Sequence, residues 1–513
     1  MFKHLVLPVI AVGAVACALA TAPSDAQPAM PVLNPDLLSE RVERYFSASA
    51  QNQVPGLIHV SVRGETIFEE GYGLANRTTG QPIDRHTIFD IGSLTKQFTA
   101  AAIMVLVDRG VLSTDDMLAQ FFPTIPDDKA SITIHQLLTH SSGLSDETGG
   151  FEGNDRGPYI SRDAFLSALF ASPLTAAPGE RFEYTNAGYS LLAAIIEDVS
   201  GQGYEAFLRE AVLTPADMHH TGYQQLDWSA ETAAHGYFWP FLDPERSDQG
   251  VFLTRWDTEP VSWRLRGNGG LHANLEDLVR WHRALQDGAI LSPEALARYQ
   301  TGYVPFSESG LYAYGWGVRT SPAGTPVLTH NGGNGIFFAW IGRFVEEDIL
   351  IIHLTNEARD SLEQAGPNVR DMVYDSALEP SPIPPSPVRE IVRYARSNPV
   401  DAVSDLSEHY QRLYGYGVEY PDIINLAARH VGAAGDEAWE LALLELNIEL
   451  FAQDGLLHFS LGEAYASRGQ RRRAIESLQR SIALGAEQEA CDWCEPAQAA
   501  LEALDGSYGE PNR

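Results

Sequence analysis

A serine and a lysine three residues apart, Ser93 and Lys96, stand directly before a strongly apolar stretch at 98–107. If a helix begins at Ser93, this spacing places the hydroxyl and the amine on one face, one turn apart. A serine hydroxyl is a poor nucleophile until a neighbouring base takes its proton. A lysine buried against an apolar helix can have its pKa lowered enough to be that base. The pair therefore predicts nucleophilic catalysis; the alternative is a helix-capping serine beside a solvated lysine.

Lysine is scarce in the chain, and this scarcity favours the catalytic interpretation. It occurs only at Lys3, Lys96 and Lys129, whereas lysine and arginine together number 35. Only an amine can be tuned to lose its proton, because a guanidinium group stays charged. The stretch that follows Lys96 is also too apolar to be a solvated helix face, which weakens the alternative.

A tyrosine and an asparagine two residues apart, Tyr184 and Asn186, form a second motif, Y-x-N. They follow the turn sequence Pro-Gly-Glu at 178–180 and lead into an amphipathic helix predicted at 191–199. Both side chains could point into one cleft, where a phenol close to an ammonium group can act as a base and then as an acid. The alternative is a buried tyrosine beside an asparagine that only forms a turn.

A third motif, His330-Asn331-Gly332-Gly333, ends a strand predicted at 326–329. Glycine at this place lets a substrate backbone approach closely. A free backbone N–H there could help to form an oxyanion hole. The alternative is a glycine-rich hairpin without a chemical role.

The order of these motifs, S-x-x-K, then Y-x-N, then H-x-G, resembles the serine β-lactamase and penicillin-binding-protein superfamily. The resemblance is to its broad class C-like branch, which includes esterases and D-stereospecific peptidases, and it covers roughly residues 35–375. It extends to three segments that are similar to framework segments of that branch, namely TIHQLLTHSSGL at 133–144, GGL at 269–271 and YGWG at 314–317.

The resemblance implies a role for the reacting residues. Ser93 would be the nucleophile, Lys96 its proton partner and Tyr184 the general base and acid. The backbone N–H groups of Ser93 and Gly333 would bind the oxyanion. No metal and no cofactor is implied. The chain contains neither G-x-S-x-G nor H-E-x-x-H, which disfavours an α/β-hydrolase and a zincin.

The third motif departs from the family pattern and bears on the substrate. Asn186, His330 and Gly332 would contact substrate, but true class C β-lactamases carry K-T-G where this chain has H-N-G. The lysine of K-T-G helps to hold the carboxylate of a β-lactam, whereas a neutral His330 can donate only one hydrogen bond. We therefore expect a serine hydrolase of the esterase or D-peptidase type that acts on an ester or an amide. The alternatives are a β-lactamase or a peptidoglycan DD-peptidase and, from another class, an inactive binding protein that acts through helical repeats.

The elements that would position these motifs alternate apolar strands with amphipathic helices. Residues 57–62 and 66–70 are typical of an antiparallel hairpin, and strands are also predicted at 326–329, 335–344 and 348–354. Strands at both ends with helices between them predict an α/β (α+β) domain whose antiparallel sheet is closed by the two ends. The resemblance implies the serine β-lactamase-like fold, with helices that flank the sheet and an all-helical insert.

The chain divides into four predicted segments. Residues 1–26 are typical of a signal peptide, with an apolar run at 5–20 and small-residue sites at 18–20 and 24–26. Residues 27–378 hold the hydrolase domain, and 379–388, EPSPIPPSPV, form a stiff proline-rich linker. Residues 389–513 hold a small all-α domain and a tail, with helical pairs at 424–450 and 457–484 whose leucines match after 35 residues. This pattern resembles the tetratricopeptide repeat, and the alternative is an ordinary helical bundle.

The formal net charge of −33 disfavours nucleic acid and anionic membranes as partners. We expect a small-molecule or peptide substrate, and a protein partner could bind through the helical repeats. The predicted signal implies an exported protein, periplasmic or secreted, without a membrane span after signal removal. In such a protein Cys491 and Cys494 are expected to form a small local disulfide.

Overall fold

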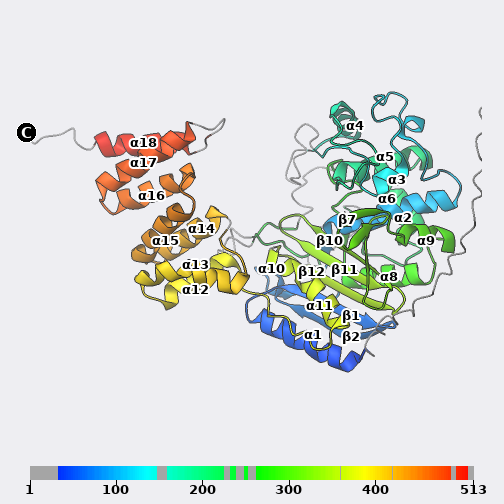
Figure 1. Ribbon diagram of the computed structural model, residues 1–513, viewed down its shortest axis with the longest axis horizontal. Coiled ribbons are helices and arrows are strands. Elements are labelled where there is room, and N and C mark those ends of the chain that lie inside the picture. The colour runs from blue at the N-terminus through cyan, green and yellow to red at the C-terminus, as the bar shows by residue number, and fades with distance from the viewer. Residues whose placement is uncertain are drawn as a thin grey trace, which may run out of the picture.

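The computed structural model describes residues 33–146, 159–223, 232–238, 248–251, 261–358, 360–418, 420–486, 491 and 493–506. The predicted signal peptide at 1–26 and the tail after 506 lie outside these residues. Figure 1 shows a part that contains the sheet and, after it in the chain, a group of helices. Within the described ranges no helix has the length and the apolar character needed to cross a membrane.

The larger part is built on one eight-stranded antiparallel sheet. In spatial order its strands are β2 (Glu65–Tyr72), β1 (Gly56–Val62), β12 (Ile349–Thr355), β11 (Phe338–Phe344), β10 (Pro326–Gly333), β9 (Gly317–Thr320), β8 (Gly310–Tyr312) and β7 (Val304–Ser307). Val60 of β1 lies opposite both Phe68 of β2 and Ile351 of β12. The predicted hairpin and the predicted closure of the sheet by the two ends are therefore confirmed. Two small ladders accompany the sheet, β3 (Leu74–Asn76) with β4 (Gln81–Pro82) and β5 (Phe89–Asp90) with β6 (His272–Ala273).

Helices cover both faces of the sheet (Figure 1). All seven residues of β1 are buried, and successive side chains of a strand point to opposite faces. Ile58 packs in one core with α1 (Pro35–Ala50) and α11 (Ala365–Tyr374), whereas Leu57 packs in the other with α2 (Thr95–Asp108) and α8 (Leu275–Gln286). Burial contributes about 1.5–3 kcal/mol for each large apolar side chain, so the two cores hold the sheet firmly between the helices.

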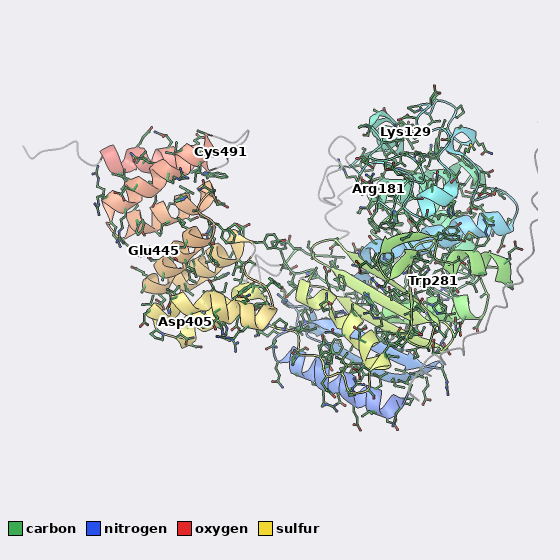
Figure 2. The ribbon with its side chains drawn as sticks, in the orientation of Figure 1. Lys129, Arg181, Trp281, Asp405, Glu445 and Cys491 are labelled. Atoms are coloured by element: carbon green, nitrogen blue, oxygen red, sulfur yellow. A yellow bond between two sulfur atoms is a disulfide. The ribbon has the colours of Figure 1, made fainter. Side chains whose placement is uncertain are left out.

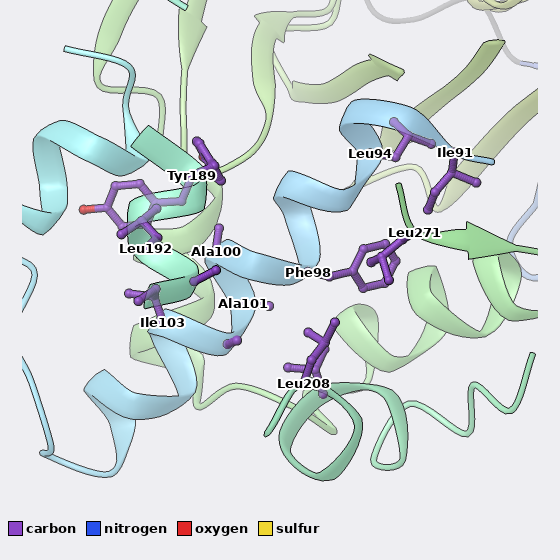
Figure 3. Close-up of a cluster of buried hydrophobic side chains, with 14 of the residues drawn as sticks. Ile91, Leu94, Phe98, Ala100, Ala101, Ile103, Tyr189, Leu192, Leu208 and Leu271 are labelled. Carbon is purple, nitrogen blue, oxygen red and sulfur yellow. The ribbon is translucent and has the colours of Figure 1, made fainter. Parts of the chain in front are cut away.

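The helix α2 lies in the middle of the second core. Every residue from Thr95 to Leu106 is buried, and Figure 3 shows Phe98 and Ile103 of α2 among side chains of α5 (Asn186–Ser200) and α6 (Tyr204–Leu208). The helix predicted at 98–107 is confirmed. Ser93 is not its first residue, however, but lies in a 3₁₀ turn, η1 (Gly92–Leu94). The reason is local: Gly92 adopts a left-handed φ of 50°, which turns the chain before the α-helix begins.

An all-helical insert lies at the top of Figure 1, between the early and the late strands of the sheet. It contains η2 (Leu118–Gln120), α3 (Ile134–Leu138), α4 (Arg162–Ala171), α5, α6 and the π-helix η3 (Arg209–Leu213). The helices α8 and α9 (Pro293–Gln300) return the chain to the sheet, and α10 (Asp360–Glu363) precedes α11. The expected architecture, an antiparallel sheet with flanking helices and a helical insert, is confirmed.

The predicted linker at 379–388 is shorter in the structure and is held in place. The helix α12 (Pro387–Ser397) begins two residues before the predicted boundary, because proline is accepted in the first turn of a helix. Ile383 is buried, with 2% exposed. Its N–H donates to Ser49 Oγ at 2.9 Å, and its carbonyl accepts from Asn52 Nδ2 at 2.8 Å. The linker is therefore tied to the end of α1.

Helices alone make up the rest of the described chain. After α12 come η5 (Val400–Asp405), α13 (Leu406–Tyr414), α14 (Pro421–Ala433), α15 (Glu437–Leu450), α16 (Gly455–Ser467), α17 (Arg471–Gly485) and α18 (Cys494–Gly506). The two predicted helical pairs correspond to α14 with α15 and to α16 with α17. A disulfide joins Cys491 to Cys494, and Figure 2 places Cys491 among these C-terminal helices. The helical region is thus present, and its tetratricopeptide assignment stays a prediction.

Candidate active site

The structure brings Ser93 and Lys96 together beside α5. The Lys96 ammonium is fully buried and donates to three oxygens: Ser93 Oγ at 3.1 Å, Asn186 Oδ1 at 2.7 Å and the Asn268 carbonyl at 2.8 Å. These acceptors match the three hydrogens of an ammonium group. If the amine loses its proton, two hydrogens still bind the two asparagine oxygens, and the lone pair points to Ser93. The geometry therefore suits both protonation states of a lysine that exchanges a proton with a serine.

The Asp90 carboxylate fixes the turn that contains Ser93. Asp90 is 1% exposed; it accepts the Gly92 N–H at 2.7 Å and the Asn334 side-chain amide at 3.0 Å. Asn334 follows β10 directly, so Asp90 ties the η1 turn to the end of that strand. Neither residue of this pair is among the sites predicted from the sequence. The pattern Asp-Ile-Gly at 90–92, typical of an Asx turn, was the available signal.

Tyr184 lies over the lysine, close to the serine. Its ring centroid is 4.8 Å from Lys96 Nζ. Burial raises the pKa of Tyr184 above its ordinary value, the nearby Ser93 side chain opposes this, and the charge of Asp146 adds to the rise. Because 39% of Tyr184 is exposed, water weakens these effects, but the direction favours a protonated phenol at neutral pH.

Asn186 is held by a carboxylate 40 residues earlier in the chain. Asp146 accepts the backbone N–H of Asn186 at 2.9 Å and of Ala187 at 2.8 Å, and the Thr185 hydroxyl at 2.6 Å. It thus caps the N-terminus of α5, where Thr185 itself makes no side-chain cap. A negative charge is favoured at that end of a helix. The cap fixes the asparagine that receives a hydrogen bond from Lys96, and its distance along the chain explains why it was missed.

The third motif lies at the end of β10, with His330 directed into the site. The imidazole Nε2 is 2.9 Å from the Tyr312 hydroxyl, and Nδ1 is 2.6 Å from the Asn331 carbonyl. A carbonyl can only accept, so Nδ1 carries the hydrogen. Burial, together with the charge of Lys96, lowers the pKa of His330 to about 4, and the ring is neutral at pH 7. The single N–H that was expected to serve a substrate is therefore already bonded to Asn331.

Burial lowers the pKa of five buried histidines in this part of the protein, because it disfavours the charged imidazolium. These buried histidines are His140, His272, His282, His330 and His353. All five are therefore neutral near pH 7.

The two glycines of the third motif meet the serine turn directly. A β-carbon placed on Gly332 would lie 2.1 Å from the Ile91 carbonyl oxygen and 2.7 Å from Ser93 N. One placed on Gly92 would lie 2.6 Å from Gly333 N. The strand and the turn are therefore in backbone contact, and the N–H groups of Ser93 and Gly333 belong to one junction. Such a junction can hold the oxygen of a tetrahedral intermediate.

A cavity of about 400 Å³ adjoins Tyr184 and His330. Aromatic side chains form much of its wall, and two arginines and a glutamate contribute charge: Phe182, Phe306, Tyr312, Phe338, Trp340, Arg319, Arg370 and Glu363. This wall suits an apolar group on a substrate. Within the described residues, no three histidine, cysteine, aspartate or glutamate side chains are grouped to hold a metal ion.

Comparison with known proteins places the chain in a family. The family model described as Beta-lactamase matches residues 37–373, which is more than half of the chain. Penicillin-binding protein 4* of Bacillus subtilis (strain 168) is 27% identical over 328 residues, which cover 61% of this chain and 71% of that protein. Esterase EstB of Burkholderia gladioli is 27% identical over 382 residues, which cover 66% of this chain and 95% of that protein. The solved octameric penicillin-binding protein homologue from Pyrococcus abyssi has a TM-score of 0.57 at 27% identity, over 69% of this chain and 81% of that one. The chain belongs to the beta-lactamase family of serine hydrolases.

Proposed function

We propose that this protein forms an acyl ester on Ser93 while it hydrolyses an ester or an amide. The observation that carries the proposal is the buried Lys96 Nζ, 3.1 Å from Ser93 Oγ. Its hydrogen bonds to Asn186 and Asn268 occupy the hydrogens that remain on a neutral amine. The serine hydroxyl is then the group that can give its proton to the lone pair, which activates it for attack.

In the acylation step that we propose, Ser93 Oγ bonds to the carbonyl carbon and its proton passes to Lys96. The Ser93 and Gly333 N–H groups bind the oxygen that becomes negative. The raised pKa of Tyr184 keeps its phenol protonated, so Tyr184 gives its proton to the leaving alcohol or amine as the carbonyl re-forms.

In the deacylation step the same groups work in the opposite direction. The Tyr184 phenolate takes a proton from water, and the hydroxide bonds to the acyl carbon. The bond to Ser93 Oγ breaks, and Lys96 returns the proton to that oxygen. One water is consumed, an acid and the leaving group are released, and every side chain regains its starting protonation state.

Esters without a carboxylate are the substrates that we propose, ahead of β-lactams. His330, which is neutral, stands where the K-T-G pattern has the lysine that holds a β-lactam carboxylate, and the two arginines of the cavity wall lie on other elements, β9 and α11. A charge-assisted hydrogen bond contributes about 1.5–3 kcal/mol, so its loss costs about one to two powers of ten in specificity. The likeness to esterase EstB over 95% of that protein supports this order. The likeness to penicillin-binding protein 4* supports the second candidate, a β-lactamase or a peptidoglycan DD-peptidase.

Export and a partner for the helical region complete the proposal. The apolar run at 5–20 supports a signal peptide at 1–26 and a periplasmic or secreted location. The disulfide between Cys491 and Cys494 is of the kind that persists in an oxidising compartment. We also propose that the helices from Pro387 onwards are tetratricopeptide repeats, which would offer a surface to a protein partner.

Ester and cephalosporin hydrolysis by matched variants test this function. Wild type, Ser93→Ala and His330→Lys are compared on p-nitrophenyl butyrate and on a chromogenic cephalosporin. Ser404→Ala, an exposed serine of η5, controls for the substitution itself. We expect ester hydrolysis that Ser93→Ala abolishes, little cephalosporin hydrolysis, and some gain of the latter in His330→Lys. Efficient cephalosporin hydrolysis by wild type would favour the second candidate, and no Ser93-dependent hydrolysis of either would favour the inactive binding protein.

A further inference from the structure

His140 lies at the centre of the site in an unusual backbone conformation. It is fully buried and has a positive φ of 54°, which is uncommon for a residue other than glycine and costs energy that its surroundings must offset. Its ring packs against three tyrosine rings, with centroid distances of 4.3 Å to Tyr184, 5.0 Å to Tyr189 and 4.7 Å to Tyr312. The acylation and deacylation steps above do not use this residue.

His140 holds the backbone on both sides of Tyr184. Its carbonyl accepts the Glu183 N–H at 2.7 Å, and its Nδ1 accepts the Thr185 N–H at 3.2 Å. The imidazole plane is tilted by 35° from the Tyr184 ring that it contacts. One residue therefore contacts Tyr184 through its ring and fixes both neighbouring peptide groups, so a shift of His140 must move the phenol.

A directed chain of hydrogen bonds leads from the second motif to the third. At one end the Thr185 N–H can only donate, so His140 Nδ1 accepts and His140 Nε2–H donates to the Tyr312 hydroxyl at 3.2 Å. At the other end the Asn331 carbonyl can only accept, so His330 Nδ1 donates and its Nε2 accepts from Tyr312. The two ends are assigned independently and agree, because Tyr312 then accepts one bond and donates one. The agreement requires both histidines to be neutral.

We propose that His140 is a positioning residue, which fixes Tyr184 against Ser93 and, through Tyr312, fixes the orientation of His330. The inference rests on the proposed function, since it concerns the rate at which Ser93 is acylated. It predicts that the two ring nitrogens of His140 have separable effects. Loss of the bond to Thr185 affects the proton transfers of Tyr184, whereas loss of the bond to Tyr312 affects only the His330 end.

Two substitutions separate the ring nitrogens. Asn Oδ1 occupies nearly the place of His Nδ1 and can accept the Thr185 N–H, and asparagine tolerates positive φ. Gln can instead place its amide near His Nε2 and donate to Tyr312. We expect His140→Gln to lower kcat for p-nitrophenyl butyrate about tenfold, as for one lost hydrogen bond that holds a reacting group, with KM nearly unchanged. His140→Asn and Tyr312→Phe should each lose less than about threefold.

The test combines these variants with Tyr184→Phe. In that background His140→Gln should cause no further loss of kcat, because the phenol that it positions is absent. His353→Asn is the control for removal of a buried histidine, since neither ring nitrogen of His353 has a partner among the described residues; melting temperatures are measured for all variants. The proposal is overturned if His140→Gln lowers kcat equally in the wild-type and the Tyr184→Phe backgrounds, or if Tyr312→Phe lowers kcat as much as His140→Gln does. If His140→Gln does not fold, wild-type kcat in His140→Asn with a tenfold loss in Tyr312→Phe would also overturn it. If Ser93→Ala hydrolyses p-nitrophenyl butyrate as fast as wild type, the proposed function is overturned instead.

Discussion

Gly332 offers the sharpest perturbation of the junction between β10 and the serine turn. A β-carbon there would lie 2.1 Å from the Ile91 carbonyl oxygen and 2.7 Å from Ser93 N, whereas ordinary contacts begin near 3.4 Å. Gly332 is not in the left-handed region, so alanine is allowed by the backbone and the effect is purely steric. The strand and the turn must separate by about 1 Å. A misplacement of about 1 Å at a reacting centre costs about 10²-fold in rate, and overpacking costs about 1–3 kcal/mol of stability.

Gly333→Ala is the matched control, one residue further along the strand. Its β-carbon would meet Phe337 and Phe338 atoms at 3.6 Å, which is an ordinary contact, and its backbone N–H is kept. The assay is kcat/KM for p-nitrophenyl butyrate with a thermal melt of each variant. We expect a loss of about a hundredfold in Gly332→Ala and a much smaller loss in Gly333→Ala. If the two variants lose activity equally, or if Gly332→Ala stays close to wild type, the backbone contact does not position Ser93.

Three further predictions follow from the same geometry. Lys96→Arg should lower kcat/KM by about 10³-fold, nearly as much as Lys96→Ala, because a guanidinium cannot become the neutral base. The control is Lys129→Arg, at a lysine that pairs with Asp128, and its activity should be close to wild type. A Lys96→Arg variant that keeps most of its activity would refute the role of Lys96 as a base. The buried histidines have pKa values near 6.5 in the unfolded state and lower values in the folded state, so between these values the unfolded state binds more protons. The free energy of unfolding should therefore be highest above pH 6.5 and fall as the pH is lowered towards 4. A melting temperature that does not change between pH 7 and 4.5 would contradict this. A chain that ends at Leu378 should unfold at lower urea than one that ends at Ser386, because it loses buried Ile383, a difference of about 1.5–3 kcal/mol; equal midpoints would show that the linker contact contributes nothing.

The elements and motifs that could be predicted from the sequence are those that a local pattern marks. The alternation at 57–62 and the apolar run at 98–107 are local, and both elements are present as β1 and α2. The three motifs also needed no long-range information to be noticed, because serine with lysine and tyrosine with asparagine are close in the chain. Their convergence could be inferred only from the resemblance, since residues 93, 184 and 330 are joined by the fold and not by any spacing.

The long-range contacts of the supporting residues could not be predicted, because each contact joins distant parts of the chain. Asp146 caps a helix that begins at Asn186, and Asp90 binds Asn334. Nothing local marks an aspartate as a cap for a distant helix. His330 shows the same limit in another way, since its tautomer depends on Tyr312 and on its own backbone. The predicted linker runs past the start of α12, because a proline-rich run disfavours the interior of a helix, whereas Pro387 occupies the first turn, where proline is accepted.

The central claim is that Ser93 carries a transient acyl group, and the mass of the trapped protein tests it most directly. Wild type, Ser93→Ala and Lys96→Ala are incubated with a fluorophosphonate probe, and the intact mass of each is measured. The account predicts one probe added to wild type, none to Ser93→Ala, and much slower labelling of Lys96→Ala. Labelling of Ser93→Ala at the wild-type rate, or no labelling of folded wild type, would contradict it.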